Sequence, residues 1–160
     1  MALSADTARS TTRTREQTRS ADEAALSIVI EAIAKAVREK DVDAMLAHCA
    51  PDIVIFDMLP PLKHQGRDAI QRLWKKTLAA FDAPVDYEVH QLELAVGEEI
   101  AFCRSLNRFG GARVGGERNV NWLCSTLGFR KLEGRWKLVH QHVSVPFDME
   151  TGKAMLDLKP

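Results

Sequence analysis

Residues 118–147 read RNVNWLCSTLGFRKLEGRWKLVHQHVSVPF, and this stretch decides the fold class. Two runs rich in Val, Leu, Phe and Trp, at 118–130 and 135–145, flank a short turn that contains Gly134. Aromatic and β-branched residues favour strands, and a short glycine-containing connection joins two strands into an antiparallel hairpin. The same pattern precedes the stretch at 85–96 and 99–109, so we predict four long antiparallel strands.

Three helices are predicted before these strands. The first begins at Asp22, where apolar residues recur at helical spacing, and the second covers roughly 42–49. A short strand at Ile53–Asp57 and a loop at 58–66 separate the second helix from the third, which is predicted at 67–81. Two prolines and a glycine exclude regular structure from that loop.

The chain is therefore expected to be an α+β protein. Strands longer than the usual five or six residues must twist and curl. Three N-terminal helices packed on such a curved antiparallel sheet form a cone-shaped roll with a natural pocket. We predict a disordered tail at 1–20, the cone domain at 21–147 and a C-terminal tail at 148–160. The broad sheet face that three helices leave uncovered predicts a homodimer.

Composition excludes several classes of partner. Lys plus Arg and Asp plus Glu both number 22, which is unlike a protein that binds nucleic acid. No apolar run approaches the roughly 20 residues of a membrane helix, so no membrane association is expected. The three cysteines are odd in number and widely spaced, which predicts neither disulfides nor a zinc site and fits a cytoplasmic location.

Several motifs together resemble a known superfamily. They are Asp57 with PPLKHQG at 60–66, Arg67-Asp68-Ala69, the Glu133-Gly134-Arg135-Trp136 turn and the ending 140–147. Over about residues 22–150 the chain is similar to the nuclear-transport-factor-like cone, also called ketosteroid-isomerase-like, and within it to the SnoaL-like or DUF4440-type branch. The ending also resembles that of the association domain of calcium/calmodulin-dependent kinase.

This resemblance implies a cystatin-like architecture and two alternative functions. One is an isomerase, cyclase or dehydratase-type enzyme that needs no cofactor or metal and acts on a small, largely apolar molecule in the cone. The other is a non-catalytic ligand-binding or dimeric assembly module. Fold membership does not decide between them.

Asp57 is the candidate catalytic base, because the resemblance to the isomerases places their general base at the end of the first strand. A carboxylate in a closed apolar cavity would have a raised pKa. The alternative is that Asp57 caps the following loop by accepting backbone N–H bonds.

The same resemblance suggests the pocket residues. It directs Trp122, Cys124 and Thr126 into the cone, with Gln141 on the last strand and Arg104 as a possible partner for a ligand carboxylate. The alternatives are that Trp122 is a core aromatic, that Cys124 is an inert buried thiol and that Arg104 is exposed to solvent. Steroid isomerisation is disfavoured, because Thr126 stands where the isomerase has an aspartic acid and the only tyrosine, Tyr87, lies on a later strand.

His140 and His142 are two residues apart, so both side chains leave the same face of the last strand. They could chelate a metal if a third ligand converged. Counting the alternation along this strand places Gln141 in the pocket and both histidines on the opposite face. We therefore expect an interface or structural hydrogen-bonding role for them, in preference to catalysis or metal binding.

Overall fold

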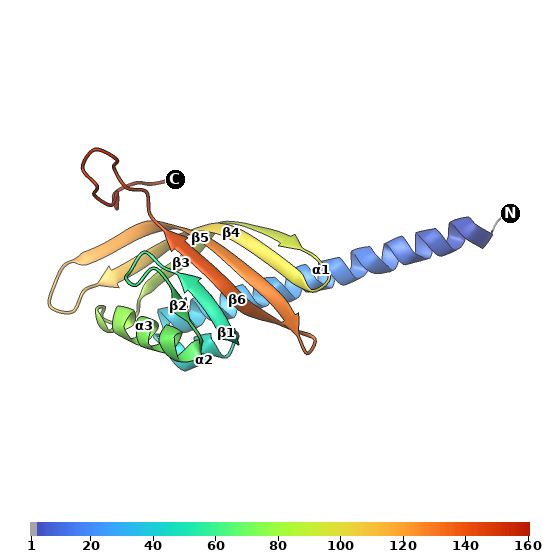
Figure 1. Cartoon of the computed structure of the whole chain (residues 1–160), viewed down its shortest axis with the longest axis horizontal. Helices are drawn as coiled ribbons and strands as arrows, with labels where there is room; N and C mark the ends of the chain where they lie inside the picture. The colour runs from blue at the N-terminus through green and yellow to red at the C-terminus, as the bar shows by residue number, and fades with distance from the viewer. Residues whose placement is uncertain (1–2) are drawn as a thin grey trace.

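The computed structural model describes residues 3–160, which form three helices and a six-stranded sheet (Figure 1). The elements are α1 (Leu3–Arg38), α2 (Val42–Leu46), β1 (Cys49–Phe56), β2 (His64–Gln65), α3 (Arg67–Ala79), β3 (Asp86–Val96), β4 (Ile100–Ala112), β5 (Arg118–Leu132) and β6 (Arg135–Ser144). The predicted α+β class, with helices packed on a curved sheet, is confirmed.

The strands lie in the order β2-β1-β6-β5-β4-β3. The four long strands pair antiparallel, as the sequence predicts, but β1 pairs parallel with β6. Hydrophobic pattern identifies a strand without giving the direction of its neighbour, which is why the parallel pairing was not foreseen. The helices lie on one side of the sheet, and the long strands curve over them (Figure 1).

The first helix is longer than predicted. It begins at Leu3, so residues 3–20 are helical where composition predicted a disordered tail. Ala, Arg, Gln and Glu are good helix formers, and an ion pair at helical spacing joins Arg19 to Glu23 at 3.1 Å. Residues 16–20 are exposed, and this part of α1 extends away from the sheet (Figure 1). The segment has no apolar face to bury, and it continues the packed part of α1 outward as one helix, since extending a helix is easier than starting one.

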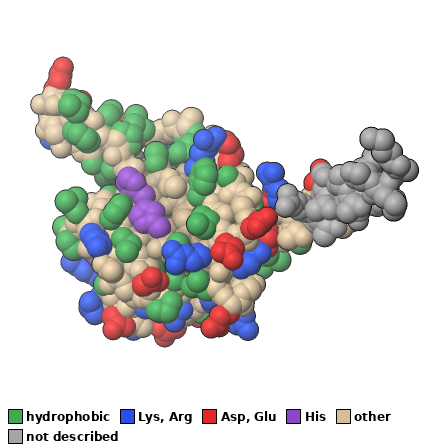
Figure 2. Space-filling model, turned by 45° about the vertical axis from the view of Figure 1, so that its right-hand side comes forward, with side chains coloured by type: hydrophobic (Ala, Val, Ile, Leu, Met, Phe, Trp, Pro, Cys, Tyr) green, Lys and Arg blue, Asp and Glu red, His purple; other side chains and the backbone are tan. Residues whose placement is uncertain are grey.

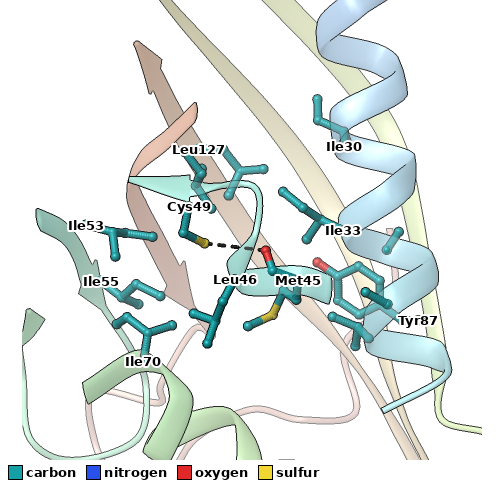
Figure 3. Close-up of a cluster of buried hydrophobic side chains, with 14 of the residues drawn as sticks. Ile30, Ile33, Met45, Leu46, Cys49, Ile53, Ile55, Ile70, Tyr87 and Leu127 are labelled. Carbon is teal, nitrogen blue, oxygen red and sulfur yellow. Dashed lines mark hydrogen bonds between the residues drawn. The ribbon is translucent and has the colours of Figure 1, made fainter. Parts of the chain in front are cut away.

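The core lies between the helices and the concave face of the sheet. Leu26, Ile53, Ile70 and Phe129 are completely buried there. Figure 3 shows side chains from α1, α2, α3 and β1 converging on this space, with the ring of Tyr87 reaching into it. The core therefore fills most of the cone.

A polar contact fixes α1 on the end of the β5–β6 hairpin. The carboxylate of Asp22 accepts hydrogen bonds from the Trp136 indole at 3.0 Å and from the Lys131 ammonium at 2.8 Å. The bond from Lys131 lowers the pKa of Asp22. This contact orients the helix that closes one side of the cone.

Residues 148–160 contain no helix or strand, and the bridge between Phe147 and Ala154 folds this end back on itself. Among the described residues, no helix combines the length and apolar character needed to cross a bilayer.

Candidate functional site

A small cavity opens between α3, the loop after β1 and the concave face of the sheet. Its volume is about 40 Å³, and a deeper apolar space of about 20 Å³ shares Trp74, Tyr87 and Gln141 with it. Spaces of this size admit one or a few waters. A larger ligand would therefore need the loop at Met58 and Leu59, which covers the cavity, to move.

Asp57 directly follows β1 and lines this cavity. Its Oδ1 accepts a hydrogen bond from the Leu59 backbone N–H at 2.8 Å, while no described residue donates to Oδ2. Burial raises the pKa of Asp57, and the bond from Leu59 and the nearby His64 oppose this shift. The two interpretations of Asp57 are thus compatible, because one oxygen caps the loop and the other is free.

Tyr87 lies in the same cavity at the end of a hydrogen-bonded chain. The Ser105 hydroxyl donates to Asn107 Oδ1 at 2.8 Å, and Asn107 Nδ2 donates to the Tyr87 hydroxyl oxygen at 2.9 Å. The Tyr87 proton is therefore left to donate to a ligand. Burial raises the pKa of Tyr87 to about 12, so the hydroxyl keeps its proton at neutral pH.

Sequence reasoning missed Tyr87 as a site residue because it lies on a later strand than the tyrosine of the isomerases. The curvature of the sheet brings β3 across the cone to the same cavity as Asp57. A signal was present, since Val85, Tyr87 and Val89 alternate with polar residues and so form the inner side of this strand.

Gln141 points into the cavity, where the alternation along β6 had placed it. The residue is 7% exposed, and its side-chain amide has no hydrogen-bond partner among the described residues. An unpaired amide can offer both a donor and an acceptor to a ligand.

Four of the predicted pocket residues lie on the opposite, convex face of the sheet. Leu123, Ser125, Leu127 and Phe129 are the buried side of β5, so Trp122, Cys124 and Thr126 face outward. Leu127 and Phe129 could have indicated which face of β5 is buried, because these large apolar residues alternate in step with Leu123 and Ser125. Arg104 is likewise on the outer side of β4, where it pairs with Glu93.

Three of these outward residues still lie together. Arg104, Cys124 and Thr126 line an open depression of about 230 Å³ on the convex face. The Trp122 ring instead contacts His90, with ring centroids 4.8 Å apart. None of the four reaches the cavity beside Asp57.

His140 and His142 are also on the convex face, as the alternation along β6 indicated. His140 Nδ1 is 3.0 Å from the Val54 carbonyl oxygen, and the Phe56 ring lies 5.0 Å from His140 and 6.2 Å from His142. Among the described residues, no group of three or more His, Cys, Asp or Glu side chains is arranged to hold a metal ion.

Several solved structures share the fold of this chain. An NTF2-like protein of unknown function from Pseudomonas putida KT2440 is 35% identical, with a TM-score of 0.81, over 88% of this chain and 98% of that one. A ketosteroid isomerase-like protein from Erwinia carotovora atroseptica SCRI1043 is 19% identical, with a TM-score of 0.65, over 76% and 93%.

The association domain of CaMKII from C. elegans shares the fold at 18% identity and a TM-score of 0.63, over 80% of this chain and 98% of that one. No curated protein matches the sequence. The family profile of the SnoaL-like domain matches residues 27–148, which is most of the cone. The chain therefore belongs to the SnoaL-like domain family, within the NTF2-like proteins.

Proposed function

We propose that the protein is an enzyme of the isomerase, cyclase or dehydratase type that needs no cofactor and acts on a small, largely apolar molecule. One observation supports this most directly. The free oxygen of Asp57, a carboxyl whose pKa is raised by burial, lines the same cavity as the unshared proton of Tyr87. A base and a hydrogen-bond donor in one apolar site are what proton transfer beside a carbonyl requires.

Each group has a defined role in the proposed reaction. Asp57 Oδ2 removes a proton from a carbon next to a carbonyl, and the C–H electron pair moves toward the carbonyl oxygen. Tyr87 donates its hydrogen bond to that oxygen as negative charge develops on it. In an isomerisation the proton then passes from Asp57 to another carbon. In a dehydration it passes from Asp57 to a hydroxyl on the carbon next to the deprotonated one, the C–O bond breaks, and the hydroxyl leaves as water. Gln141 positions the ligand through hydrogen bonds from its unpaired side-chain amide.

The loop after β1 is expected to admit the ligand. Small-molecule pockets usually measure roughly 300–1,000 Å³, far more than the cavity of about 40 Å³. Met58 and Leu59 are 40% and 41% exposed, so little packing opposes their outward movement. Because the cavity is apolar and the proposed chemistry needs a carbonyl group, apolar carbonyl compounds are the first class to test.

A pair of variants tests the proposed enzyme. Asp57→Asn keeps the acceptor for Leu59 but cannot take a proton, and Asp52→Asn is the matched control because Asp52 is exposed on the same strand. With a substrate found by screening, Asp57→Asn should lower kcat by about 10²–10⁴-fold and leave ligand affinity nearly unchanged. Unaltered turnover in Asp57→Asn would exclude the proposed base.

A dimeric assembly module is the second candidate. It is supported by the fold shared with the CaMKII association domain and by large apolar side chains on the surface. Phe56, Phe102 and Ile100 are 44%, 52% and 67% exposed. Phe56 lies against His140 and His142, so His140→Ala with His142→Ala should weaken a dimer in sedimentation velocity. A wild-type chain that is monomeric at micromolar concentration would reject this candidate.

A further inference from the structure

A second concave surface, which we name the basic groove, lies between residues 60–65 and α3. Its volume is about 350 Å³, and Lys63, His64, Arg72 and Lys76 contribute to its lining. It adjoins the cavity, because Leu73 and Lys76 line the groove while the next residues, Trp74 and Thr77, line the cavity.

The groove carries positive charge without a counter-charge. Arg72 and Lys76 are one helical turn apart and so share a face of α3, and Lys63 approaches from the loop. None of these three cations forms an ion pair among the described residues, and no acidic residue lines the groove. On the face that Figure 2 shows, the cationic and acidic side chains are interspersed.

His64 supplies an independent observation. His64 lies in the segment that the sequence predicts to be a loop, but β2 pairs it with Ile55 of β1, and only 9% of the residue is exposed. Its Nε2 is buried without a hydrogen-bond partner. Buried ring nitrogens normally find a partner, so this atom marks a polar position beside the groove that the chain itself leaves unsatisfied.

We propose that the basic groove binds the oxyanion of a small organic molecule, either a carboxylate or a phosphate. Arg72 can hold such a group with two parallel N–H bonds, which a lysine cannot do. Lys63 and Lys76 add charge, and His64 also lines the groove. A small molecule fits better than a protein surface, because the three cations line a concave site of about 350 Å³.

The site is independent of the chemistry proposed for Asp57, although the two surfaces adjoin. If both hold, the natural ligand has an apolar part for the cavity and an acidic group for the groove. Its anionic end would then be held while Asp57 acts on the apolar part.

The test is an NMR titration of the full chain with inorganic phosphate and, separately, with acetate, at constant ionic strength set by chloride. We expect saturable shifts of the 63–65 amides, the His64 ring and the Arg72 side chain. Saturation by acetate alone identifies a carboxylate site, and saturation by phosphate alone a phosphate site. Shifts that stay linear with both anions would overturn the proposal.

Two double variants distinguish specific anion binding in the groove from attraction by positive surface charge in general. Arg72→Gln with Lys76→Gln removes two charges from the groove, and Lys75→Gln with Arg130→Gln removes two exposed charges outside it. The first should weaken binding at least about tenfold, and the second should change it little. Equal weakening in both would contradict a built site. Asp57→Asn should bind the anion at least as tightly as wild type, because it removes a negative charge near His64, and this result distinguishes the proposal from the function proposed above.

Discussion

Replacing Asp57 should change stability in a pH-dependent way. The pKa of Asp57 is raised in the folded chain by burial, so ionisation costs free energy there that it does not cost in the unfolded chain. Below the unfolded pKa, the carboxyl is neutral in both states and the cost is absent. As pH rises through the folded pKa, wild type loses stability. Asn carries no charge at any pH. The stability of Asp57→Asn relative to wild type should therefore rise in that pH window and stay constant above it.

The hydrogen bond to Leu59 sets the difference in stability between Asp57→Asn and Asp57→Ala. Asn retains an oxygen for the Leu59 N–H, which is 2.8 Å from Oδ1, whereas Ala does not. Asp57→Ala should therefore be less stable than Asp57→Asn by about 1 kcal/mol at every pH. Each unit by which the folded pKa of Asp57 exceeds the unfolded one is worth about 1.4 kcal/mol in the first comparison.

Urea unfolding from pH 4 to pH 8 measures both differences, with Asp52→Asn as the control for removing an exposed carboxylate from the same strand. The advantage of Asp57→Asn should grow with pH and then level off. An advantage of the same size at all pH values would show that folding does not shift the pKa of Asp57. A disadvantage that grows with pH would show that the fold stabilises the ionised carboxylate. The reasoning about burial would then be wrong.

Three further predictions follow from other contacts. Tyr87→Phe leaves Asn107 Nδ2 buried without its acceptor and should cost about 1–3 kcal/mol in urea unfolding, but much less in an Asn107→Ala background. Gly110→Ala should cost more than about 2 kcal/mol, because a Cβ there would lie 2.0 Å from the Asn119 carbonyl oxygen at φ +154°; near-normal stability would contradict the register of β4 and β5. A thiol reagent should label Cys124 quickly in the native chain and all three cysteines in urea, since the other two are buried with thiol pKa values raised to about 11.

Much of the fold could be predicted because local pattern determines it. The four long strands and α3 follow from apolar periodicity and from glycine-containing turns, and their observed bounds differ from the predicted ones by only a few residues. The parallel pairing of β1 could not be foreseen, since direction depends on tertiary packing. The helical start of α1 was missed because half of residues 3–20 are Ser, Thr or Asp, which are poor helix formers, whereas the segment extends a helix that packing has already formed.

The candidate site was harder to predict than the fold. Asp57 and Gln141 could be placed from the end of a strand and from alternation. Trp122, Cys124 and Thr126 were assigned to the wrong face because one step in the alternation moves every side chain of a strand to the other side. Tyr87 comes to Asp57 through sheet curvature, which no local pattern encodes.

The central claim is that Asp57 is a partly desolvated carboxyl available to accept a proton. The most direct test follows the side-chain carboxyl carbon of Asp57 by ¹³C NMR during a pH titration of the ligand-free protein, with Asp57→Asn identifying the resonance. We predict a pKa above the usual aspartate value of about 3.9. A pKa at or below that value would mean that the loop hydrogen bond outweighs burial, and Asp57 would then be a structural cap instead of a base.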